Sequence, residues 1–110
     1  MTTDELIEQF EACTLPASLF HHAQHVEAAW GYLHRYPLPD AIARFSTALQ
    51  RYATSLGAPQ KYDAALTRRC FSAIAGRLAL DPDADWPRFA ARHPELMSRA
   101  TPPPPATLST

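Results

Sequence analysis

Four segments of the chain carry apolar residues at intervals of three and four, and proline or glycine stands at or just beyond the end of each. This spacing is the signature of an amphipathic helix. The predicted helices cover about residues 4–13, 21–36, 40–56 and 61–79. Apolar and polar residues never alternate for long, and β-branched residues are sparse, so no strand is expected. The pattern predicts an all-α fold, a compact bundle of four main helices.

The stripe on each segment predicts which side chains form the core. The expected core residues are Leu6, Phe10 and Cys13; Val26, Ala29, Trp30, Leu33 and Tyr36; Ile42, Phe45, Leu49, Tyr52 and Leu56; Tyr62, Leu66, Cys70, Ile74 and Leu78. Thr3 is expected to cap the first helix. A short fifth helix is expected from Trp86 to Arg92, capped by Asp85 and with Pro87 in its first turn.

The length of 110 residues suits one hydrophobic core. We expect residues 1–100 to form a single helical domain. From Thr101 the composition changes to a run of four prolines followed by small polar residues. That stretch predicts a disordered tail over residues 101–110.

Charge and hydropathy exclude several classes of function. The formal net charge is -1 and no basic block is present, so the chain lacks the electrostatic footprint of a nucleic-acid binder. The start of the chain is polar and acidic, which is unlike a signal peptide, and no stretch approaches the roughly 20 apolar residues of a membrane span. We therefore expect a cytoplasmic protein in which Cys13 and Cys70 are buried thiols. The low charged fraction of 19% makes a homodimer one alternative to a monomer.

Three of the five histidines fall between Phe20 and Val26. His22 and His25 are three residues apart, so on a helix they share a face, and that face continues into core residues. Imidazole is a common ligand of zinc and of non-haem iron, and a helix fixes the separation of two such ligands. Asp63 shares one face of the fourth segment with Thr67 and Cys70, which makes it the candidate third ligand.

A purely structural interpretation of the same residues stays open. His22 lies near the start of its helix, where it can hydrogen-bond Ser18 or a loop carbonyl. Asp63 lies near a helix N-terminus, where the helix dipole favours a carboxylate without any function. Two histidines at this spacing with no fixed partner are also a weak motif.

Two blocks of the sequence carry a family resemblance. The first reads F-x-H-x-x-H-V/L followed by an A-W-x-Y-L-like stretch, and the second resembles G-x-P-x-x-Y-H-E-T-I-T. The matching residues are Phe20, His22, His25, Val26 and Ala29–Leu33 in the first block, and Gly57, Pro59 and Tyr62–Thr67 in the second. Over roughly residues 18–78 the chain resembles a family of small, uncharacterised bacterial all-helical proteins.

The resemblance implies a cluster of three histidines, with a neighbouring glutamate, between the second and fourth helices. His22 and His25 occupy two of these positions. Asp63 stands at the third histidine position and Ala64 at the glutamate position, which is a departure at the centre of the implied site. The substitution leaves either a two-histidine, one-carboxylate set suited to iron or a site without metal.

These observations predict a small enzyme that acts on a small molecule, with a divalent metal (iron or zinc) held by His22, His25 and Asp63. Trp30, Tyr62 and Thr67 are expected to shape the substrate pocket. One alternative is a metal-free enzyme in which Asp63 and a histidine do acid–base work. Another is a module without catalysis that binds a ligand or dimerises.

Overall fold

A computed structural model of the protein describes residues 1–58 and 64–97. The described elements, in chain order, are α1 (Thr3–Glu11), the 3₁₀ turn η1 (Ala17–Leu19), α2 (His22–Arg35), α3 (Leu38–Ser55), α4 (Ala64–Leu80), α5 (Trp86–Arg92) and the 3₁₀ turn η3 (Pro94–Met97). No strand occurs in these two ranges, which confirms the all-α prediction. The predicted tail, residues 101–110, lies outside them. Among the described helices none is long and apolar enough to cross a membrane.

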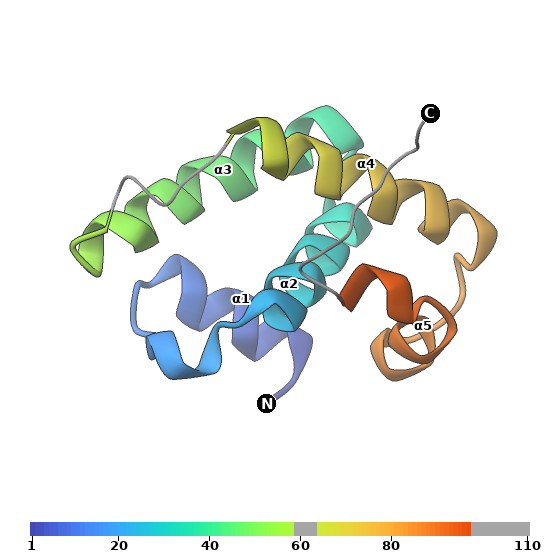
Figure 1. The fold of residues 1–110 in the computed structure, drawn as a ribbon, viewed down its shortest axis with the longest axis horizontal. Coiled ribbons are helices and arrows are strands. Elements are labelled where there is room, and N and C mark those ends of the chain that lie inside the picture. The colour runs from blue at the N-terminus through green and yellow to red at the C-terminus, as the bar shows by residue number, and fades with distance from the viewer. Residues whose placement is uncertain (59–63, 98–110) are drawn as a thin grey trace.

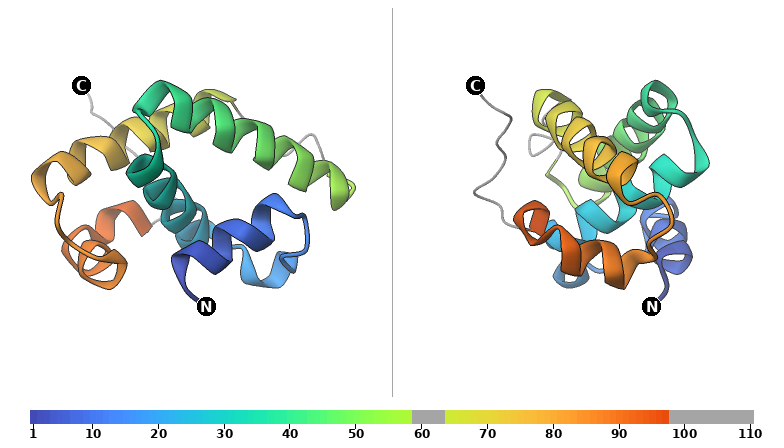
Figure 2. Two further views of the ribbon diagram at one scale, coloured as in Figure 1. Left: turned by 180° about the vertical axis from the view of Figure 1, so that it is seen from behind. Right: turned by 90° about the vertical axis from the view of Figure 1, so that its right-hand side faces the viewer.

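Helix α2 lies at the centre of the bundle. It packs against α1, α3, α4 and η3. In Figure 1, α3 and α4 form the upper layer, while α1 and α5 lie below them on either side of α2. The views from behind and from the side in Figure 2 show the same arrangement. A residue on α2 is therefore close to several elements at once.

The central position of α2 buries more of its surface than one stripe. Val26, Ala29 and Trp30 are buried as predicted, but Ala28, Gly31 and Tyr32 on the other side are buried as well. Tyr32 is 1% exposed, and its hydroxyl donates a hydrogen bond to Glu11 at the end of α1. Burial, together with that carboxylate, raises the pKa of Tyr32 well above its ordinary value, so the phenol stays neutral.

Helices α1 and α2 approach each other closely at Gly31. A Cβ atom at this position would lie only 2.6 Å from Ile7 Cδ1 and 3.0 Å from Thr3 Cγ2. A side chain at this position therefore requires Ile7 to shift, and the restriction comes from lack of space and not from backbone conformation.

Phe10 is the centre of an aromatic cluster that joins the first half of the chain. Its ring is fully buried and lies 4.9 Å from Phe20, 5.3 Å from Phe45 and 5.5 Å from Tyr52, measured between ring centroids. The Tyr52 hydroxyl donates a 2.8 Å hydrogen bond to the Leu15 carbonyl, which satisfies its polar group inside the cluster. The cluster fixes α1, the chain before α2, and α3 relative to one another.

The start and end of α1 differ from the prediction. Thr2, and not Thr3, is the N-cap: its side chain accepts a 3.1 Å hydrogen bond from the Glu5 backbone, and the Glu5 side chain accepts one of 2.8 Å from the Thr2 backbone. This reciprocal pair is a capping box. The helix ends at Glu11 because Cys13 has a positive φ of 60°.

The two cysteines are less buried than predicted. Cys13 and Cys70 are both half-buried.

The apolar stripes of α3 and α4 are partly wrong in the prediction. Leu56 and Leu66, expected in the core, are 50% and 41% exposed. In α4 Ile74 is buried as predicted, and Thr67 and Phe71 are buried in addition, since the large Phe71 ring packs against Phe45 at 5.1 Å. The short helix α5 agrees with the prediction: Asp85 is its N-cap and accepts a 3.0 Å hydrogen bond from the Arg88 backbone.

Candidate functional site

The first turn of α2 positions both predicted histidines. The Gln24 side chain accepts a 3.0 Å hydrogen bond from the backbone N–H of His21, which fixes where the helix begins. His22 and His25 then lie one turn apart, and both are half-buried. His21 is exposed, as its place off the stripe predicts.

Both histidines line a cavity of about 120 Å³ between α2, α3 and α4. Its lining residues are His22, His25, Val26, Ala29, Phe45, Leu49, Leu66, Thr67, Cys70, Phe71 and Ile74. Most of these side chains are apolar, and the two imidazoles are the only ionisable groups among them besides the Cys70 thiol. An apolar cavity of about 150 Å³ accommodates benzene. The cavity therefore suits a molecule of a few heavy atoms, held beside two imidazoles.

The orientation of His22 is set by a residue far away in the sequence. Its Nε2 atom lies 3.0 Å from the carbonyl oxygen of Leu96 in η3. A carbonyl can only accept a hydrogen bond, so Nε2 must carry the proton, and Nδ1 of the neutral ring is left as an acceptor or ligand. The purely structural interpretation of the sequence predicts that His22 hydrogen-bonds Ser18 or a loop carbonyl. The observed partner is a carbonyl, but it belongs to η3.

The orientation of His25 is set by an aromatic contact. Its ring stacks on Phe20, with centroids 4.0 Å apart and an interplanar angle of 22°. Phe20 is itself held in the Phe10 cluster. The aromatic cluster therefore holds the plane of the His25 ring through Phe20.

Thr67 and Cys70 of α4 complete the polar part of the cavity wall. Thr67, a predicted pocket residue, is 8% exposed and lines the same cavity as the two histidines. Burial raises the pKa of the Cys70 thiol, which keeps it protonated near neutral pH and makes it a poor nucleophile.

Trp30 does not line this cavity. Its ring faces α5, with centroids 5.7 Å from Trp86 and 6.2 Å from Phe89. It borders a separate surface hollow between α1, α2 and α5, and its Nε1 atom has no hydrogen-bond partner within residues 1–58 and 64–97. Trp30 therefore lies apart from the histidine pair.

A metal site of ordinary type needs at least three protein ligands. Within the part of the chain that the structure describes, no three histidine, cysteine, aspartate or glutamate side chains lie close enough to hold a metal ion. That part supplies two imidazoles. The predicted third ligand, Asp63, and the predicted pocket residue Tyr62 both lie outside the described residues.

Comparison of the chain with known protein families, with curated proteins and with solved structures gives no match. The family resemblance therefore stays a prediction.

Proposed function

We propose that the protein is a small enzyme that acts on a small, largely apolar molecule in the cavity between α2, α3 and α4. The observation that supports this proposal is the placement of two imidazoles on the wall of a largely apolar cavity. Imidazoles that face such a cavity can contact a bound molecule as hydrogen-bond donors, acceptors or ligands. Turnover, with a small-molecule substrate, is expected in the cytoplasm.

The first form of the proposal is a metal enzyme with His22, His25 and Asp63 as ligands. Two histidines and one carboxylate suit iron(II) or zinc, with coordination positions left open. Histidines that bind metals almost always donate their other N–H to a carbonyl or carboxylate. The contact of His22 Nε2 with the Leu96 carbonyl has that form and leaves Nδ1 for the metal. Such a metal would act as a Lewis acid toward the substrate or toward water.

The second form needs no metal. With its proton held at Nε2 by Leu96, neutral His22 presents the lone pair of Nδ1 as a general base. Asp63 would then orient an imidazole or stabilise its positive charge.

The apolar wall of the cavity also favours a third candidate, a ligand-binding module without catalysis. It would bind the same class of molecule.

Elemental analysis separates the two catalytic forms. We expect protein purified without a histidine tag, or reconstituted with Fe(II) or Zn, to contain about one metal per chain, as one three-ligand site requires. The His25→Ala variant should lose that metal because two ligands rarely retain it. His34→Ala is the matched control, since His34 lies on the same helix but is exposed. Equal metal content in wild type and His25→Ala, or none in either, would exclude the metal form.

Binding of a small apolar probe tests the cavity itself. We expect benzene to shift the NMR signals of Val26 and Ile74, both of which line the cavity, in a saturable way. Ala29→Leu should abolish this response, because the added side chain fills space at a wall residue that is only 2% exposed. Ala65→Leu is the control, since Ala65 is exposed on α4. If benzene produced no saturable shifts, or the same shifts in both variants, the cavity would not be the binding site.

A further inference from the structure

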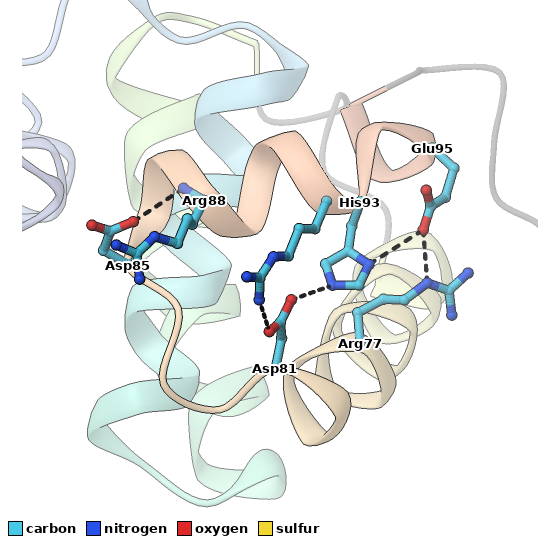
Figure 3. A network of polar contacts seen from close by, with 7 residues as sticks. Arg77, Asp81, Asp85, Arg88, His93 and Glu95 are labelled. Carbon is cyan, nitrogen blue, oxygen red and sulfur yellow. Dashed lines mark hydrogen bonds and ion pairs between the residues drawn. The ribbon is translucent and has the colours of Figure 1, made fainter.

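A network of charged side chains joins the end of α4 to α5 and η3 (Figure 3). His93 lies at its centre: Nε2 is 3.3 Å from Asp81 Oδ2, and Nδ1 is 3.8 Å from Glu95 Oε2. Each carboxylate also has an arginine partner. Arg77 Nε donates a 2.8 Å hydrogen bond to Glu95, and Arg92 forms an ion pair with Asp81. The imidazole is therefore held between two carboxylates that come from different elements.

The core of this network is more buried than an ordinary surface ion pair. The His93 side chain is 12% exposed and that of Asp81 is 16% exposed. The guanidinium of Arg77 lowers the pKa of Glu95, so this carboxylate is ionised at neutral pH. The His93 ring also contacts the fully buried Phe89 ring, at 4.8 Å between centroids. Exposed pairs hold side chains weakly, whereas a partly buried and connected set such as this one fixes them.

The network is attached directly to the residue that orients His22. His93 immediately precedes η3, and its carbonyl accepts a 3.1 Å hydrogen bond from the Leu96 backbone N–H. The Leu96 side chain is 8% exposed, and its carbonyl is the acceptor for His22 Nε2 at 3.0 Å. A continuous series of contacts therefore runs from Asp81 and Glu95 through His93 and Leu96 to His22 at the cavity.

We propose that His93 is a positioning residue for His22: held by Asp81 and Glu95, it fixes η3 so that the Leu96 carbonyl keeps the proton of His22 on Nε2. This inference rests on the proposed function, in which Nδ1 of His22 is the atom that works. His93 itself lines no wall of the cavity and acts only through the backbone of η3. Nε2 of His93 lies within hydrogen-bond distance of Asp81, and Nδ1 faces Glu95 at a longer 3.8 Å.

The test follows the His22 Nε2–H proton by ¹⁵N NMR in protein free of metal and ligand. We expect its exchange with water to accelerate about tenfold in His93→Gln, as for loss of one well-formed hydrogen bond. The backbone amide of Ala48, a buried residue of α3, reports global stability and should keep its protection. Arg88→Gln is the matched control, because the Arg88 side chain is exposed and has no ion pair within the described part of the chain.

Unchanged exchange of the His22 proton in a folded His93→Gln variant would overturn the proposal, since Leu96 would then be held by its own packing. Equal acceleration at His22 and Ala48 would also overturn it, as a purely structural role predicts that result. If His93→Gln does not fold, Glu95→Gln replaces it under the same criteria, because the Glu95 side chain is 43% exposed and its loss is milder. The measurement of proton exchange needs no metal and no substrate. It therefore tests the role of His93 even if the proposed enzymatic function is wrong.

Discussion

Replacement of Phe10 with alanine is expected to lower the free energy of unfolding by about 3–5 kcal/mol, the usual cost of emptying a buried phenylalanine site. Phe10 is 0% exposed and touches three aromatic rings from different parts of the chain. Those rings are held by other contacts and will not close the space. Domains of this size are stable by about 5–15 kcal/mol, so the variant would lie close to the limit of folding. Urea unfolding followed by circular dichroism measures the difference.

Leu56→Ala provides the control for this experiment. Leu56 is as apolar as a core residue but 50% exposed at the end of α3. Its replacement should change the free energy of unfolding by about 0.5 kcal/mol or less. A loss below about 2 kcal/mol for Phe10→Ala would show that the cluster collapses around the vacated space and is not the rigid centre that we describe.

Replacement of Gly31 with valine is expected to destabilise the protein by about 1–3 kcal/mol, the range for overpacking a core. The first added carbon would already lie 2.6 Å from Ile7 Cδ1, and the two γ carbons need still more room. Ile7 is 1% exposed and has little free space to move into. Thermal unfolding should show a lower Tm, because α1 and α2 must separate to admit the side chain.

Gly76→Val is the matched substitution for Gly31→Val. Gly76 also lies inside a helix, α4, but a Cβ atom there would meet nothing within 4 Å. Valine forms helix somewhat better than glycine, so this variant should be neutral or a few tenths of a kcal/mol more stable. Equal effects of the two substitutions would mean that helix propensity, and not the close approach of α1 and α2, determines the result at Gly31.

Much of the fold could be predicted because periodicity and chain breakers act locally. All five α-helices were expected, and the bounds of α5 agree with the prediction. The errors arise where tertiary packing decides. A single stripe was assumed for α2, but a central helix is covered on several sides, which buries Tyr32 and Gly31. In α4 the Phe71 ring, and not Leu66, faces the core, because the aromatic contact with Phe45 determines how the helix is rotated.

Only part of the cavity lining could be predicted from the sequence. Helical spacing placed His22 and His25 on one face, and the cavity wall contains both of them and Thr67. Spacing says nothing about partners far along the chain, so the Leu96 carbonyl could not be foreseen. Trp30 has the same periodicity as the cavity residues, yet it lies far enough around α2 to face α5. Phe20 begins the same short motif as the histidines, which indicates that it belongs to the site. That its ring stacks on His25 becomes visible only in the structure.

The contact between His22 and Leu96 joins residues 74 positions apart, and this has a consequence for how the protein is made. During translation the parts of the chain that surround Phe10 are synthesised first and can begin to associate while the ribosome is still working. His22 lacks the Leu96 carbonyl as the acceptor for its ring proton until residue 96 has been added and η3 has docked. The part of the cavity that is synthesised first, at His22, is therefore completed only when the last described residues have been synthesised. A nascent chain arrested before Pro94 would contain the aromatic cluster but leave this imidazole free to turn.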